Sequence, residues 1–350
     1  MIPISVCIIT KNEADYLKKC LEALKPYPFE IVVTDTGSED NSVEIARQYT
    51  DRVYEFTWIN DFSAARNFCV SHASHDTILS LDTDEYLRPL DWSALQQALE
   101  EHPKSRGAIE LFSYFDVDGE TKHQVMRLER LFDRRYYHFV NPIHEVLVPI
   151  APMEPTSYDA PVSVDHVGYQ GTAEKLRKKA ERDITMIRSE LETDPENPYL
   201  NFQLGQSYML MRDHENALLW FRRAMALNPM PGADYTLVLL CNYAGILLDN
   251  GQVEEAAKIL SYRNFYADYK DFLCLSGRIY LLMGQPLKAL PEFVQALSAP
   301  KYSLVNPYAP SYYIGFIYEM FGKRDIACTH YENCGEFPPA VEALKRLSTL

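Results

Sequence analysis

The chain reads Ile78-Leu79-Ser80-Leu81-Asp82-Thr83-Asp84-Glu85 where a short apolar run meets three carboxylates. The run is long enough for one buried strand. Carboxylates at this spacing repel one another and lose hydration unless a cation lies among them. Oxygen ligands suit a hard divalent cation shared with phosphates, and open α/β sheets bind ligands at the carboxyl ends of their strands. The stretch therefore predicts either a cation site at a sheet edge or an acidic surface turn.

The segments before this stretch alternate between strand and helix patterns. Short apolar runs predict four strands, over residues 4–9, 30–34, 53–56 and 77–82. Apolar residues at helical spacing predict three helices, over residues 12–24, 41–49 and 61–73. Strands that alternate with helices imply an α/β domain with a mostly parallel sheet covered on both faces.

The pattern changes after about residue 105. Two strands are predicted over residues 107–114 and 123–128, with a turn at residues 116–119 between them. Residues 149–162 contain four prolines, and we expect them to form an extended loop.

The chain from about residue 172 is helical throughout and repeats. Residues 198–229 carry the tetratricopeptide pattern through Leu204, Gly205, Tyr208, Ala217, Phe221, Ala224 and Pro229, with Asn201 where an aromatic residue is usual. Three weaker copies follow, marked by Ala244, Leu247, Ala256 and Leu260, by Gly277, Tyr280, Ala289 and Phe293, and by Gly315, Tyr318, Ala327 and Tyr331. In each copy the small residues would let two helices approach, and the large ones would fill the groove between them. We therefore expect an all-α solenoid.

The composition indicates a folded protein of two domains. The chain has 350 residues, which exceeds the usual single core, and 47% of them are hydrophobic. The formal net charge of −15 disfavours broad nucleic-acid binding and an electrostatic hold on anionic membranes. No apolar run is long enough for a transmembrane helix, no signal peptide is evident, and the seven cysteines include no Cys-x-x-Cys pair. We therefore expect a reduced, cytoplasmic protein without zinc.

Four motifs in the first half occur in the order of a known family. They are residues 9–13 (Ile-Thr-Lys-Asn-Glu), 33–40 (Val-Thr-Asp-Thr-Gly-Ser-Glu-Asp), 61–67 (Asp-Phe-Ser-Ala-Ala-Arg-Asn) and 82–84 (Asp-Thr-Asp). Through them, roughly residues 4–170 resemble the family-2 glycosyltransferases, whose catalytic domain has the nucleotide-sugar-binding fold called GT-A. The resemblance implies a GT-A domain over residues 1–170, a linker helix over 171–195 and a tetratricopeptide-repeat domain over 196–350.

The whole chain resembles the subgroup in which this domain is fused to tetratricopeptide repeats, which includes the sublancin-type peptide S-glycosyltransferases. This likeness is carried by residues 60–67, 130–132, 143–145 and 166–169, although Pro142 and Ile143 depart from the small residues usual before the His-Glu pair. It implies an inverting enzyme that moves a sugar from a UDP-sugar to a Cys, Ser or Thr side chain of a peptide or protein. The cofactor would be Mg²⁺ or Mn²⁺.

The resemblance also assigns roles to residues. The donor would be bound by Thr10, Asn12, Glu13, Asp35, Arg66, Asp82 and Arg130. The cation would be held directly by Asp84, through water by Asp82, and by His166. Glu145 would be the general base that takes a proton from the acceptor, and His144 would hold the acceptor or a phosphate.

Each assignment has a structural alternative. Asp35 also suits an Asx turn before Gly37, Arg66 a structural salt bridge, Glu145 a surface turn and His166 the seam between domains. Glu85 could lie next to the cation without binding it, or it could belong to an acidic surface turn. The basic residues at 175–182 form either a phosphate site or, as the spacing favours, a solvated helix face.

The repeats indicate a partner. Tetratricopeptide arrays present a groove for polypeptide segments, so we expect the repeats to hold a peptide or protein acceptor, or to pair two copies as a homodimer. Two other functions remain open: transfer to a lipid-linked or cell-surface saccharide, and a non-catalytic peptide-binding scaffold.

Overall fold

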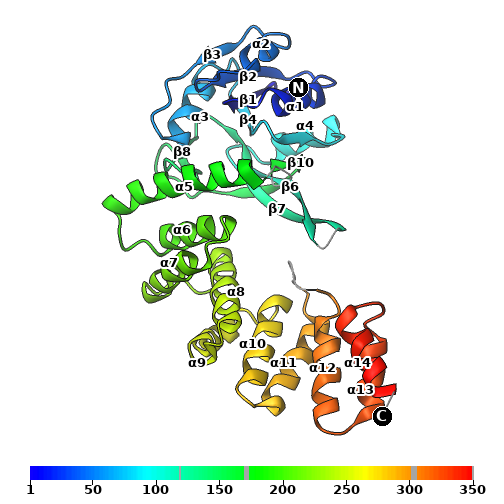
Figure 1. The fold of residues 1–350 in the computed structure, drawn as a ribbon. Coiled ribbons are helices and arrows are strands. Elements are labelled where there is room, and N and C mark those ends of the chain that lie inside the picture. Colours follow the sequence, from blue (N-terminus) through cyan, green and yellow to red (C-terminus); the bar gives the residue numbers. More distant parts are fainter. Residues whose placement is uncertain (118–119, 169–172, 301–305, 349–350) are drawn as a thin grey trace. The chain divides into compact units, whose positions relative to one another are not determined.

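The structure, a computed structural model, describes residues 1–117, 120–168, 173–300 and 306–348. The chain forms two compact units, Met1–Met186 and Ile187–Leu350 (Figure 1). Tyr169 and the tip of the predicted turn at Asp118 and Gly119 lie outside the described residues, as does the side chain of Lys175.

The first unit is built on a sheet whose strands follow the order β3-β2-β1-β4-β7-β6-β10-β5. Its first half is parallel and consists of β1 (Ile4–Thr10), β2 (Glu30–Asp35), β3 (Val53–Glu55) and β4 (Thr77–Leu81). These strands coincide with the four predicted ones, so the predicted α/β fold is confirmed. Their carboxyl ends lie along one edge, where parallel sheets bind ligands.

Helices cover both faces of this sheet. They are α1 (Ala14–Leu24), α2 (Ser42–Ala46), α3 (Phe62–Ser71) and α4 (Trp92–Glu101). The alternation along β1 shows the two layers, because Val6 packs in one core with α1, α2 and α4, whereas Cys7 packs in the other with α3. The side chains of β1 are therefore buried on both faces, as expected for a central parallel strand.

The second half of the sheet is mixed. It adds β5 (Glu85–Leu87), β6 (Arg106–Val117), β7 (Glu120–Asp133) and β10 (Ser157–His166), and a separate hairpin pairs β8 (Tyr137–Val140) with β9 (Val146–Pro149). Strand β7 is antiparallel to both β4 and β6. The prediction of a loop over residues 149–162 is wrong for its second part, which belongs to β10. The strand tolerates Pro161 because its register with β6 shifts between Asp159 and Ser163, which frees the proline from the ladder.

The second unit consists of helix pairs after α5 (Ala173–Thr193), the helix that contains the boundary between Met186 and Ile187. The helices are α6 (Pro198–Leu210), α7 (His214–Ala226), α8 (Asp234–Asp249), α9 (Val253–Ala256), α10 (Lys270–Leu282), α11 (Pro286–Ser298), α12 (Ala309–Met320), α13 (Arg324–Glu332) and α14 (Pro338–Ser348). The second predicted copy differs from the others, because α9 is short and continues as the 3₁₀ helix η2 (Ala257–Phe265).

Glycines mark the close approach of the paired helices. A Cβ on Gly277 would stand 2.5–2.8 Å from ring atoms of Phe293, and one on Gly315 would stand 2.9 Å from the ring of Tyr331. These pairs are the small and large positions that the repeat pattern predicts. The helix pairs therefore have the predicted tetratricopeptide packing.

Replacing Gly277 with alanine is expected to destabilise the repeat unit by about 1–3 kcal/mol, because the added methyl group overlaps the Phe293 ring. Urea unfolding followed by far-UV circular dichroism measures the change. Gly245→Ala in α8 is the matched control, since its Cβ would meet nothing within 4 Å, and it should stabilise its helix by about 0.5–1 kcal/mol. Equal destabilisation by both substitutions would contradict the packing argument.

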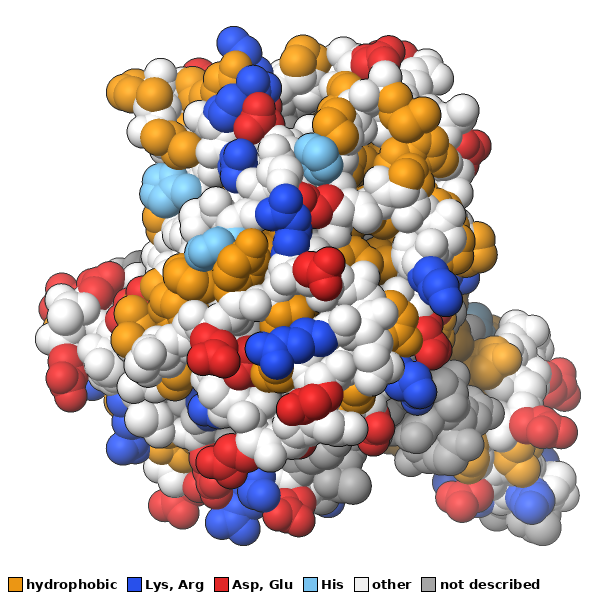
Figure 2. Space-filling model, turned by 90° about the horizontal axis from the view of Figure 1, so that it is seen from above, with side chains coloured by type: hydrophobic (Ala, Val, Ile, Leu, Met, Phe, Trp, Pro, Cys, Tyr) orange, Lys and Arg blue, Asp and Glu red, His pale blue; other side chains and the backbone are white. Residues whose placement is uncertain are grey.

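Figure 2 shows Lys, Arg, Asp and Glu side chains intermixed over the face in view, with apolar side chains between them. The visible described surface thus has no continuous patch of one sign that would steer a charged partner. None of the described helices combines the length and apolar character needed to cross a lipid bilayer.

Candidate active site

Polar side chains gather where β1, β2 and β4 end. Thr10 and Asp35 are paired residues of the β1–β2 ladder, and Asp82 follows the last residue of β4. All three strands run in the same direction. The topology therefore brings three segments that are far apart in sequence to one edge of the sheet.

Asp35 has two distinct carboxylate oxygens. Its Oδ2 accepts hydrogen bonds of 3.0 Å from the backbone N–H groups of Gly37 and Ser38, which is the Asx turn left open as an alternative. Its Oδ1 is buried without a hydrogen-bond partner among the described residues, and so is Oγ1 of Thr10. Buried oxygens normally have partners, so this pair offers hydrogen-bonding capacity to a ligand.

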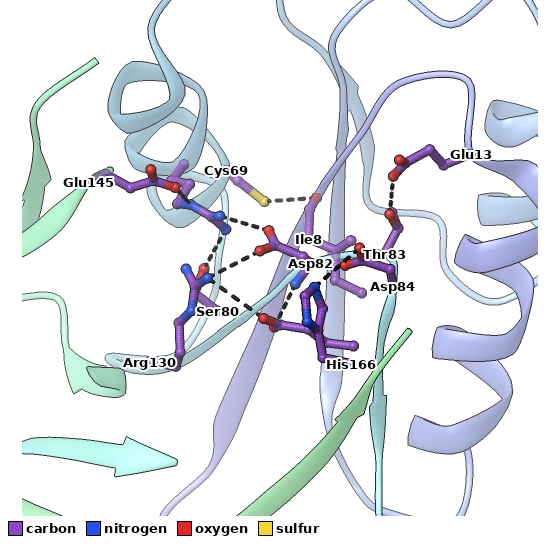
Figure 3. A network of polar contacts seen from close by, with 12 residues as sticks. Ile8, Glu13, Cys69, Ser80, Asp82, Thr83, Asp84, Arg130, Glu145 and His166 are labelled. Carbon is purple, nitrogen blue, oxygen red and sulfur yellow. Dashed lines mark hydrogen bonds and ion pairs between the residues drawn. The ribbon is translucent and has the colours of Figure 1, made fainter. Parts of the chain in front are cut away.

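Asn12 and Glu13 hold the loop after β1. Asn12 has φ 54°, accepts a hydrogen bond of 2.7 Å from the Glu39 N–H, and donates its own backbone N–H to Ser38 Oγ at 2.9 Å. Glu13 accepts a hydrogen bond from the Thr83 hydroxyl, and burial raises the pKa of its carboxyl group (Figure 3). These contacts tie the predicted donor-binding loop to the Asp82–Asp84 segment.

Five charged side chains form one ion network across the site, with carboxylates and guanidiniums in alternation. Arg66, buried in α3, donates from Nε to Glu145 and from Nη2 to Asp82 Oδ1 at 2.7 Å. Arg130, on β7, donates to the other oxygen of Asp82 at 3.1 Å and lies 3.7 Å from Glu85 (Figure 3). The order is thus Glu145, Arg66, Asp82, Arg130, Glu85.

The network sets the protonation of its carboxylates. Burial opposes the ionisation of Asp82, but Arg66 and Arg130 outweigh it and hold the pKa of Asp82 well below its usual range. Burial likewise opposes the ionisation of Glu145, and Arg66 lowers its pKa in spite of it. Burial and the charge of Asp82 raise the pKa of Glu85 to about 7. Asp82 and Glu145 are therefore ionised at neutral pH, whereas Glu85 sits near its midpoint.

Asp84 and His166 form a second cluster next to the network. His166 Nε2 lies 3.4 Å from Asp84 Oδ2 (Figure 3). Its Nδ1 lies 3.0 Å from Ser113 Oγ. Burial lowers the pKa of His166, but the Asp84 carboxylate more than compensates, so the net shift is upward. The backbone of Gly168 closes this cluster, because a Cβ there would overlap the Asp84 carboxylate and stand 3.0 Å from His166 Nε2.

These two side chains fit a divalent cation. Two cis ligands of an octahedral ion at about 2.1 Å lie about 3 Å apart, close to the separation of the Asp84 oxygen and the His166 nitrogen. The missing Cβ of Gly168 lets the Asp84 carboxylate and the His166 ring lie this close to its backbone. Among the residues that the structure describes, however, no three His, Cys, Asp or Glu side chains converge on one point. Of the three predicted metal ligands, Asp84 and His166 come together, whereas Asp82 is engaged with two arginines.

The predicted catalytic pair lies in the turn between β8 and β9. His144 has φ 54°, and burial lowers the pKa of its imidazole. The turn is fixed to α3, since the Phe62 N–H donates to the Pro142 carbonyl at 2.8 Å. Glu145 is thus connected to the site by its ion pair with Arg66. This contact is compatible with Glu145 as the base and also with a structural salt bridge.

The predicted basic cluster on α5 mainly makes local ion pairs. Lys178 pairs with Glu174 at 2.9 Å and Arg177 with Glu181 at 2.8 Å, both exposed, as expected for a solvated helix face. Arg182 also makes a local ion pair, with Asp183 at 2.8 Å, and in addition its guanidinium lies 5.0 Å from the centre of the Phe62 ring.

Sequence reasoning missed the small residues that support the charged ones. Ser80 accepts a hydrogen bond of 3.2 Å from Arg66, Ser113 contacts His166, and Thr83 donates to Glu13. The only signal was Ser80, a polar residue within an otherwise apolar strand. Gly168 belongs to the stretch 166–169 that carries the resemblance, but its role could not be predicted, because it depends on which residues meet in space.

Two families match parts of the chain. Residues 5–151 match the family described as Glycosyl transferase family 2, and residues 198–229 match the tetratricopeptide repeat. The first range covers the sheet unit from β1 to β9 and ends before β10, and the second covers the first helix pair, α6 and α7.

Several known proteins are similar to this chain. A TPR repeat-containing protein of Synechococcus elongatus is 32% identical over 273 residues, which cover 75% of this chain and 66% of that protein. The SPbeta prophage-derived glycosyltransferase SunS of Bacillus subtilis is 25% identical over 318 residues, covering 85% and 72%. The solved TPR protein YrrB superposes with a TM-score of 0.42 at 17% identity, over 49% of this chain and 88% of that one. This chain thus spans about two thirds of the first relative.

Proposed function

The N-terminal unit of this chain belongs to glycosyl transferase family 2 and is followed by tetratricopeptide repeats, and on this premise we propose that the protein transfers a sugar from a UDP-sugar to a peptide or protein side chain with inversion. The observation that carries the proposal is the pairing of Asp84 and His166 beside the ionised Asp82, at the carboxyl edge of the parallel strands. A diphosphate donor needs hydrogen-bond acceptors for its nucleoside and positive charge for its phosphates. The unpartnered oxygens of Thr10 and Asp35 would supply the acceptors, and a cation held by Asp84 and His166 would supply the charge.

The nucleoside would lie against Asp35 and Thr10. Their unpartnered oxygens would accept hydrogen bonds from the base or ribose. Asp82, held ionised by Arg66 and Arg130, would accept from the ribose hydroxyls. Asn12 and Glu13 would fix the loop that lines this pocket.

The phosphates would lie towards Asp84 and His166, which would hold Mg²⁺ or Mn²⁺. The bound cation would offset the charge that develops on the departing diphosphate. His166 would present Nε2 to it because Ser113 engages Nδ1.

Glu145 would act as the base. Its lowered pKa keeps it ionised at neutral pH, so it is available to accept the acceptor's proton. The ion pair with Arg66 weakens its basicity, which favours an acceptor that ionises readily. A cysteine thiol, with a pKa of about 8.5, needs less help than a serine or threonine hydroxyl. The repeats would present the acceptor as an extended segment.

The test is incubation of the protein with a panel of UDP-sugars, Mn²⁺ or Mg²⁺, and peptides containing Cys, Ser or Thr. UDP release that requires both cation and peptide supports the proposal, and mass spectrometry locates the modified atom. If UDP were released only with lipid-linked saccharides, the acceptor would be a saccharide and not a peptide. No cation-dependent turnover across the panel would overturn the proposed function.

Ser113→Ala is expected to weaken Mn²⁺ binding about tenfold, because it removes the hydroxyl that orients the His166 ring. Isothermal titration of the protein with MnCl₂ measures the affinity. Ser71→Ala is the control, since Ser71 is exposed on α3 and bonds only its own helix backbone and the adjacent His72. Equal affinities in the two variants would remove Ser113 from the cation site.

A further inference from the structure

We propose that Gly168 allows the Asp84 carboxylate to lie beside His166 in position to share a cation, and that any residue with a side chain at this position displaces the carboxylate and weakens cation binding. The inference rests on the proposed function, because it assumes that this pair holds a cation. It concerns a residue of the stretch 166–169 to which the resemblance assigns no role.

The first step is steric. A Cβ on Gly168 would overlap Asp84 Oδ2, lie 3.2 Å from Asp84 Cγ and stand 3.0 Å from His166 Nε2. Real Cβ atoms essentially never approach other heavy atoms to less than 3.0 Å. Of the described glycines, Gly168 is the one whose Cβ would meet a carboxylate. The point that a methyl group would occupy is thus in contact with both proposed ligand atoms.

The second step concerns why a glycine is present. Gly168 does not have the positive φ that marks the turn glycines Gly251 and Gly284. A positive φ therefore does not explain its presence. The close approach of the Asp84 carboxylate and the His166 ring does.

The third step is that the neighbours cannot easily move away. The Val167 N–H donates to the Asp84 carbonyl at 3.0 Å, and His166 is paired with Glu85 in the β10–β5 ladder. The His166 ring is held further by Ser113. A side chain at position 168 would therefore have to push the Asp84 carboxylate off His166, and both would be lost to one cation.

The direct test is Mn²⁺ binding, followed by electron paramagnetic resonance of free Mn²⁺ in the absence of donor. Gly168→Ala is expected to weaken binding at least tenfold relative to the unsubstituted protein, while the control Gly245→Ala leaves it unchanged. Unchanged affinity in Gly168→Ala would overturn the inference and leave the proposed function standing. Failure of the unsubstituted protein itself to bind Mn²⁺ would overturn the proposed cation site, and this inference with it.

A double-mutant cycle tests the contact without metal. In EDTA, Gly168→Ala should lower the Tm of the unsubstituted protein but have a smaller effect in an Asp84→Ala background, where the overlapping carboxylate is gone. If Gly168→Ala alone fails to fold, the steric argument is still tested, because it predicts that the double variant with Asp84→Ala folds. An equal loss of Tm in both backgrounds would contradict the steric argument.

Discussion

Replacing Arg66 with methionine is expected to destabilise the sheet unit by about 3–5 kcal/mol, the cost of breaking a buried ion pair on one side. Arg66 is 4% exposed and is the partner of both Asp82 and Glu145. Methionine fills much of the same volume but leaves both carboxylates facing a buried, uncharged side chain. Urea unfolding at neutral pH, followed through the tryptophan fluorescence of this unit, measures the loss.

The pH dependence gives a second signature of the same change. In the unsubstituted protein the pKa values of Asp82 and Glu145 are lowered, so their stabilisation is complete above the ordinary carboxyl range and is lost as the pH falls. Without Arg66, burial would raise the pKa of Glu145 instead, and protonation would relieve the cost. The difference in stability between the two proteins should therefore narrow from pH 7 towards pH 4.

The control for this prediction is Arg177→Met on α5. Arg177 forms an exposed pair with Glu181, and such pairs contribute about 0–1 kcal/mol. Two results would mean that Arg66 does not neutralise buried carboxylates. One is a loss of stability in Arg66→Met as small as in Arg177→Met. The other is a difference in stability between Arg66→Met and the unsubstituted protein that widens as the pH falls.

Asp84→Asn is expected to lower kcat for sugar transfer at least about a hundredfold and to abolish its dependence on Mn²⁺. The amide keeps the size of the side chain but removes the charge that would hold the cation beside His166. Steady-state UDP release with saturating donor, with and without Mn²⁺, measures both effects. The fold should persist, because Asp84 lies outside the Arg66 network.

Asp159→Asn provides the matched control. Asp159 lies on β10, its side chain is 67% exposed, and its partner is the surface residue Arg127. We expect unchanged kcat and cation dependence in this variant. If the activity of Asp84→Asn still rose with Mn²⁺, the cation would have to be bound by other residues.

Local patterns predicted most of the fold. Strands β1, β2 and β4 were predictable because each is a largely buried apolar run, and β3, which is less buried, because it continues the alternation of strands and helices. The repeats were predictable because small and large residues recur at fixed spacing. The extension of β10 through Pro161 was not, since proline argues against a strand unless a bulge accommodates it, and the bulge depends on the partner strand.

The residues of the site could be predicted from the sequence, but the contacts between them could not. Arg66, Asp82, Arg130 and Glu145 were all singled out, yet nothing in their spacing showed that they share one ion network. Such contacts depend on tertiary folding, which brings α3, β4, β7 and the β8–β9 turn together. The roles of Ser113 and Gly168 were missed for the same reason, because small residues carry no chemistry until their neighbours are known.

The alternation of charge through Arg66 has a genetic consequence. Losing the positive charge of Arg66 leaves buried negative charge, and a second substitution that removes a carboxylate relieves it. Second-site suppressors of Arg66→Met should therefore arise at its two acidic neighbours, as Asp82→Asn or Glu145→Gln. Such revertants would regain expression and solubility while remaining inactive. A selection for folded protein would thus separate mutations that rescue the scaffold from those that rescue chemistry.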